Sequence, residues 1–145
     1  MAENLLKQIK DIDGVEGVYI ASNKGNVLIR LGLSLDTSVL EKVAIHLLRI
    51  LSAYHIKKRT IKEIELIWDE YRIIARNSDE FIIVAFCRSN KALSLLRITL
   101  NVVLSHLLQD KGFSKKIKSH SAHKTVVLRK GDLHTKEINL ISKLQ

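Results

Sequence analysis

The stretch DGVEGVYIASNKGNVLIRLG, Asp13 to Gly32, alternates apolar and polar residues on both sides of a central turn. A period of two residues is typical of a strand with one buried face. Between the two runs, residues 23–26 read NKGN, and Gly25 can take a positive φ at little steric cost. The stretch therefore predicts a β-hairpin, and two further glycines, Gly14 and Gly17, lead into its first strand.

Helical periods lie on both sides of this hairpin. Residues 3–12 carry an apolar stripe opposite charged residues, which predicts a short amphipathic helix. Residues 36–54 begin with several N-cap candidates, and Ser38 stands three residues before Glu41, the spacing of a capping box. Apolar residues then recur every three or four positions, which predicts a helix of about five turns with the stripe Leu40, Val43, Ala44, Leu47, Leu51 and Tyr54.

Period two returns after a basic connector at residues 55–62. Three short runs, separated by polar turn formers, predict a three-stranded meander. The runs span residues 63–68, 71–76 and 81–87. A second long helix follows, capped at Ser89 or Asn90 and ending near residues 109–112. Its leucine-rich stripe consists of Leu93, Leu96, Leu100, Val103, Leu104 and Leu107.

Length and charge limit the possible classes of protein. A chain of 145 residues with 46% hydrophobic and 27% charged residues is ordinary for one compact domain. The net charge of +9 is uneven, because residues 110–145 hold nine Lys and Arg against three Asp and Glu, or +6, which leaves +3 for residues 1–109. A basic extension favours nucleic acid, anionic lipid or an acidic protein as partner, and a plain solvated tail is the alternative.

Catalytic, metal and membrane motifs are missing from the sequence. Because it has no GxSxG, HExxH or CxxC motif and no phosphate-cradling glycine loop, we expect no enzyme activity and no cofactor. The single cysteine, Cys87, excludes an internal disulfide and is expected in the core. No apolar run reaches the roughly 18 residues of a membrane span, and residues 1–13 lack the apolar region of a signal peptide, so we expect a soluble, cytoplasmic protein.

The predicted order of elements is helix, two strands, helix, three strands, helix. With Asp13-Gly14-Val15 and Gly17 before the first strand and Gly25 at its turn, the chain resembles the roadblock domain of dynein light chains, whose architecture is related to profilin and longin domains. The resemblance implies an α+β fold, a five-stranded antiparallel sheet with the middle helix on one face and the two terminal helices on the other. We expect a roadblock-like domain at residues 1–110 and a basic, partly ordered or mobile extension at residues 111–145.

The resemblance also implies dimers, because such domains pair through the third strand and the middle helix. Two features of this chain agree. An apolar flank at Ile45 and Leu48 widens the middle helix, although a well-buried central helix is the alternative explanation. An edge strand also leaves unpaired backbone groups that a second copy can satisfy. The expected partner and dimer interface comprises Glu41, Lys42, Ile45, His46, Leu48, Arg49, Ile64, Leu66 and Trp68.

Roadblock proteins include dynein subunits, anchors of Rag-type GTPases and regulators of small Ras-like GTPases. By resemblance we expect a non-enzymatic homodimer that binds and regulates or scaffolds a Ras-like GTPase by selecting a switch conformation. A heterodimer with a sibling chain stays open. Polar contacts are expected from Glu41, Lys42, His46 and Arg49 of the middle helix, with Arg49 a solvated helix residue rather than an arginine finger.

The basic extension carries the alternative function, that of a scaffold or adaptor subunit which binds nucleic acid or an acidic protein. Phe113 is the only Phe, Tyr or Trp of residues 110–145, so nucleic acid would be held by its phosphates and not by stacked bases. The residues expected to contact an anion are Lys115, Lys116, Lys118, Lys124, Arg129 and Lys130.

Overall fold

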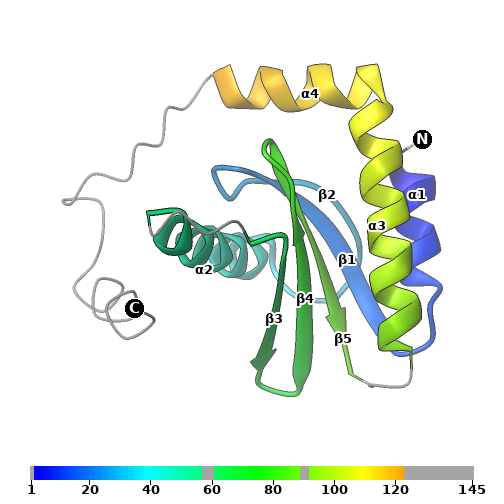
Figure 1. Ribbon diagram of the computed structural model, residues 1–145. Coiled ribbons are helices and arrows are strands. Elements are labelled where there is room, and N and C mark those ends of the chain that lie inside the picture. Colours follow the sequence, from blue (N-terminus) through cyan, green and yellow to red (C-terminus); the bar gives the residue numbers. More distant parts are fainter. Residues whose placement is uncertain (1, 57–60, 89–91, 123–145) are drawn as a thin grey trace.

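The computed structural model describes residues 2–56, 61–88 and 92–122. Its centre is a five-stranded antiparallel sheet with the strand order β2-β1-β5-β4-β3 (Figure 1). The strands are β1 (Val15–Ser22), β2 (Val27–Gly32), β3 (Glu63–Trp68), β4 (Tyr71–Asn77) and β5 (Phe81–Cys87). The predicted hairpin and meander are therefore both present, and β2 and β3 form the two edges of the sheet.

Helices cover both faces of the sheet (Figure 1). Helix α2 (Thr37–Ile56) packs on one face, whereas α1 (Ala2–Lys10) and α3 (Leu93–Gln109) pack on the other. This is the α+β arrangement that the resemblance implies, and the order αββαβββα that the sequence patterns predict is confirmed. A fourth helix, α4 (Lys111–Ala122), follows α3 and lies across one end of the sheet.

The first hairpin depends on one buried serine and two glycines. The hydroxyl of Ser22 accepts a hydrogen bond of 3.2 Å from the backbone N–H of Asn26 across the turn. Gly25 has φ +89°, in the left-handed region that favours glycine. Gly17 is required by a close approach of backbone, because a Cβ there would lie 2.9 Å from the carbonyl oxygen of Leu31. The glycines of the hairpin therefore serve backbone geometry.

Each face of the sheet has its own hydrophobic core. The α2-side core contains Tyr19, Ala21, Leu40, Val43, Ala44, Leu47, Ile73, Ala75, Ile82, Val84 and Phe86. The α3-side core contains residues of α1, α3 and α4 packed on Val18, Ile20, Ile74, Phe81, Ile83, Ala85 and Cys87. Odd and even positions of the same strands supply the two cores, as the alternation of side chains along a strand requires. The hydroxyl of Tyr19 donates a 2.9 Å hydrogen bond to the carbonyl oxygen of Leu40 and so joins β1 to α2.

Helix α4 is not predicted by the sequence patterns, which place only the end of α3 in this region. Asp110 ends α3 because it leaves the helical conformation, with φ −81° and ψ 107°. Its carboxylate then accepts hydrogen bonds from the N–H groups of Gly112 (3.0 Å) and Phe113 (3.2 Å), so it caps the N-terminus of the next helix. One aspartate therefore both ends α3 and starts α4.

Helix α4 belongs to the domain core. Phe113 and Ile117, one helical turn apart, are 5% and 0% exposed, and both lie in the α3-side core. The ring of Phe113 meets that of Phe81 edge to face, with 5.2 Å between centroids. Core residues therefore lie on both sides of the boundary that the sequence suggests at residue 110.

Candidate partner interface

Strand β3 is an edge strand. It pairs with β4 on one side, and among the described residues no strand pairs with its other side. Its alternation sends Ile64 and Leu66 towards the α2-side core, against which both are packed and partly buried. At its end, Ile67 is 76% and Trp68 is 40% exposed. On the α2 side the edge therefore combines open backbone groups with the exposed ring of Trp68, two properties of a surface that takes a partner.

Trp68 is the exposed end of an aromatic row that begins in the α2-side core. Tyr19, Phe86 and Trp68 follow one another outwards, with centroids 6.1 Å apart in the first pair and 6.0 Å apart in the second. The Trp68 and Phe86 rings meet edge to face, at 87°. Tyr71, which stands opposite Trp68 in the register of β3 and β4, also contacts Phe86, at 5.3 Å. Trp68 is thus held by the core and still presents surface to solvent.

Helix α2 contributes a mixed surface beside this edge. Leu48 packs against the α2-side core together with Ile64 and Leu66, so α2 and β3 share one apolar layer. Ile45 lies against the turn of the first hairpin, where a Cβ placed on Gly25 would approach its Cγ1 to 2.5 Å. The apolar flank of α2 therefore packs in part against the domain itself. For Ile45 and Leu48, this packing agrees with the alternative explanation that the middle helix is simply well buried.

The polar residues expected on α2 differ in their surroundings. Lys42 is exposed, whereas His46 and Arg49 are half-buried. Glu41 has a role inside the domain, because its Oε2 accepts a 3.0 Å hydrogen bond from the backbone N–H of Val27 at the start of β2. The capping-box interpretation of Glu41 is wrong, because α2 begins at Thr37 and Ser38 lies inside it.

The basic residues of the extension are placed in part. Lys115, Lys116 and Lys118 are exposed on α4, and Phe113 and Ile117 of the same helix point into the core. Lys124, Arg129 and Lys130 lie outside the described residues. Anion binding by this set stays a prediction. The apolar signal that marks α4, Phe113 and Ile117 at helical spacing, is short, and the surrounding lysines and serines obscure it in the sequence.

Cys87 has the properties of a structural residue. It is 2% exposed in the α3-side core, and burial raises the pKa of its thiol to about 11. A thiol with such a pKa is protonated at neutral pH and is a poor nucleophile. Within residues 2–56, 61–88 and 92–122, no cluster of three or more His, Cys, Asp or Glu side chains is arranged to hold a metal ion. In the same part of the chain, no helix combines the length and apolar character that crossing a membrane needs.

The order of strands, with α2 on one face of the sheet and α1 and α3 on the other, is the arrangement that the resemblance to roadblock domains implies. Comparison with protein-family models gives no match, and comparison with the sequences of curated proteins gives none either. Solved structures do match. Myxococcus xanthus MglB superposes with a TM-score of 0.66 and 10% identity, over 74% of this chain and 92% of that chain.

Two further solved structures agree with this fold. A Roadblock/LC7 domain from Streptomyces avermitilis has a TM-score of 0.61 and 11% identity, over 72% of this chain and 92% of its own. A structure described as MglB with tetrameric arrangement has a TM-score of 0.61 and 10% identity, over 81% of this chain and 88% of its own. At such low identity these likenesses establish the roadblock fold of the chain.

Proposed function

We propose that this protein is a non-enzymatic, dimeric roadblock-type protein that binds and regulates or scaffolds a small Ras-like GTPase. The observation that carries the proposal is the open edge of β3, with exposed Trp68 beside α2, in a chain whose fold is that of MglB. We propose a cytoplasmic location, as expected from the sequence.

Charge does not prevent two β3 edges from pairing. The carboxylate of Glu65 forms ion pairs with the guanidinium groups of Arg72 (2.8 Å) and Arg97 (2.7 Å). The carboxylate of Glu63 lies 3.3 Å from the guanidinium group of Arg97 and forms a third pair. Since like charges on opposed strands repel, these pairs remove an obstacle to association of two copies. A twofold axis at β3 would place the same strand of each copy side by side and extend both sheets into one.

Such a dimer also creates a binding platform. Pairing at β3 brings both α2 helices to the same face of the joined sheet, with Lys42, His46 and Arg49 of each copy available to one GTPase. Regulation requires unequal affinity for the two nucleotide states, since a protein that binds both states equally shifts nothing. Selection of one switch conformation needs no catalytic residue from this chain.

The proposal is tested in two measurements on the full chain. Light scattering coupled to size exclusion gives the mass in solution, and twice the chain mass of 16.5 kDa is expected. Titration with a Ras-like GTPase from the same cell, loaded with GDP or with a non-hydrolysable GTP analogue, is expected to give different affinities. Equal affinities would reduce the function to scaffolding, and a monomer that binds neither form would refute the proposal.

A further inference from the structure

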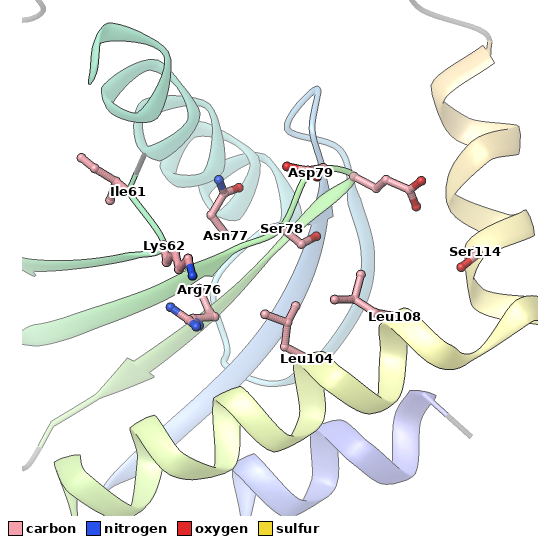
Figure 2. Close-up of a pocket in the computed structure, with 10 residues that line it drawn as sticks. Ile61, Lys62, Arg76, Asn77, Ser78, Asp79, Leu104, Leu108 and Ser114 are labelled. Carbon is pink, nitrogen blue, oxygen red and sulfur yellow. The ribbon is translucent and has the colours of Figure 1, made fainter. Parts of the chain in front are cut away.

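A cleft of about 440 Å³ lies on the other side of the sheet from the proposed dimer surface. It is bounded by the segment that leads into β3, the end of β4, the β4–β5 turn, α3 and α4 (Figure 2). Strands and helices from distant parts of the chain meet there, so the fold itself shapes the cleft. Its volume is within the range of small-ligand pockets, which begins near 300 Å³.

Arg76 supplies an unsatisfied cation in the wall of this cleft. Its side chain is half-buried, and its Nε is closed to solvent and has no hydrogen-bond partner among the described residues. Its neighbour in the β3–β4 register is Glu63, but the carboxylate of Glu63 is engaged by Arg97 at 3.3 Å. A buried donor without a partner costs free energy, which an anionic ligand can recover.

A second cation and an apolar wall complete the arrangement. Lys62 is exposed and stands next to Arg76 on the neighbouring strand end, where its carbonyl oxygen accepts a 2.8 Å hydrogen bond from the N–H of Asn77. From the opposite side, Leu104 and Leu108 of α3 project into the cleft (Figure 2). Leu108 is 51% exposed, which leaves apolar surface for a ligand to cover.

Acidic groups restrict which anion fits. Asp79 lies in the β4–β5 turn, at the far end of the cleft from Lys62 and Arg76 (Figure 2), and Glu80 of the same turn also lines the cleft. A compact polyanion such as phosphate gains nothing from the leucines and is repelled by the turn. A ligand with its negative charge at one end, an apolar middle and a positive charge at the other end complements all three zones.

We propose that this cleft binds a short segment of a partner protein in which an acidic residue is followed by apolar residues and then by a basic one. The carboxylate pairs with Arg76 and Lys62, the apolar side chains cover Leu104 and Leu108, and the basic side chain faces the turn. The proposal does not rest on dimerisation or on a GTPase, because the cleft lies on the α3 side of the sheet.

The probe for this proposal is the peptide acetyl-Glu-Leu-Leu-Lys-amide, titrated into the isotope-labelled full chain and followed by amide chemical shifts. Saturable shifts at Arg76, Ser78 and Leu108 are expected. The matched peptide acetyl-Gln-Leu-Leu-Lys-amide lacks the carboxylate and is expected to bind about tenfold more weakly. Inorganic phosphate at the same concentration is expected to leave these amides unchanged, and equal shifts with phosphate would overturn the proposal.

Variants separate the cleft from general charge effects. Arg76→Gln is expected to weaken the peptide about tenfold, and Leu108→Ala about threefold, whereas Lys7→Gln on α1, an exposed cation outside the cleft, leaves affinity unchanged. As a control for folding, each variant should have the same far-ultraviolet circular dichroism spectrum as the wild type. Because Leu108 is exposed, Leu108→Ala keeps the test meaningful even where Arg76→Gln disturbs the fold. Equal affinity of wild type and both cleft variants would refute the site.

Discussion

The two faces of strand β3 carry opposite chemistry. Towards α2 the strand presents Ile64, Leu66 and Trp68, which continue the α2-side core to the edge of the sheet. Towards α3 it presents Glu63 and Glu65, which ion pairs tie to Arg72 and Arg97. The α2 side of the edge is therefore apolar and ends in exposed Trp68, whereas the α3 side is mainly charged and partnered, with exposed Ile67 at its end. A single strand can thus provide a docking surface and a structural lock because successive side chains point to opposite faces.

The largest expected effect concerns the extent of the α3-side core. Phe113→Ala removes a buried ring that packs on Phe81, and we expect the free energy of unfolding to fall by about 3 kcal/mol. Urea denaturation of the full chain measures the change. The control Lys116→Ala alters an exposed residue of the same helix and is expected to change stability by less than about 0.5 kcal/mol. A loss below about 1 kcal/mol for Phe113→Ala would mean that α4 is not part of the core.

The next effect sharpens the contrast between the two faces of β3. Trp68→Ala removes the exposed end of the aromatic row, and we expect the Kd of the proposed dimer to rise at least about 30-fold, as for a central interface tryptophan. Analytical ultracentrifugation over a concentration series measures it. Ile67→Ala, on the other face of the same edge, is the matched control and should raise Kd less than about threefold. Equal effects would place the interface on both faces.

The third prediction concerns the pH dependence of stability that the buried thiol of Cys87 causes. The pKa of the Cys87 thiol is about 11 in the folded chain against an ordinary 9.0, because burial disfavours the thiolate. The unfolded chain therefore releases this proton at lower pH than the folded chain, and stability falls as pH rises from 9 to 11. We expect a loss of up to about 2 kcal/mol across that interval, absent in Cys87→Ala.

Tyr19 separates this effect from a general alkaline loss. Burial in the α2-side core also raises the pKa of its phenol, but from a higher ordinary value of 10.0, so its contribution is lost at higher pH than that of the thiol. The difference in stability between wild type and Cys87→Ala, measured by urea denaturation at pH 9, 10 and 11, isolates the thiol, because Tyr19 is present in both. Parallel stability curves for the two proteins would contradict the assignment.

The smallest effect concerns the ion pairs between α3 and the charged side of β3. Arg97→Gln breaks the pairs with Glu63 and Glu65, which are partly exposed, so we expect a loss of only about 0.5–1 kcal/mol. The loss should shrink in high salt, because screening weakens exposed pairs. Freed from Arg97, the Glu63 carboxylate becomes available to Arg76, its register neighbour, and peptide binding in the cleft is expected to weaken. Unchanged peptide affinity would mean that Arg97 does not keep the two apart.

Local periodicity predicted most of the fold. The bounds of β3 and β5 follow from alternation and turn residues alone, and the glycine pattern located the first hairpin. Helix α4 was missed because its apolar signal is limited to Phe113 and Ile117 within a lysine- and serine-rich segment. The capping role assigned to Glu41 failed for a different reason, since its real partner, the amide of Val27, is distant in sequence and is brought close only by packing of α2 on the hairpin.

The surfaces were less accessible to sequence reasoning. Edge position and apolar alternation indicate a partner surface on β3 and α2. The dimer interface and the GTPase contacts remain predictions. The cleft could not be predicted, because the unpaired state of Arg76 depends on two long-range facts: the register of β3 on β4, and the competition of Arg97 for Glu63. Neither leaves a local pattern in the chain.

The aspartate-capped corner between α3 and α4 has a consequence for motion. Among residues 111–118, whose burial the structure describes, Phe113 and Ile117 anchor α4 in the α3-side core, so we expect α4 to open as a unit at a lower free energy than the sheet unfolds. Its amide hydrogens should then exchange together and faster than those of β1 and β5, which are paired with strands on both sides. Because Ser114 of α4 lines the cleft, such an opening would also displace one wall of the cleft. The rate of local opening of α4 would then limit how fast the cleft binds and releases its ligand.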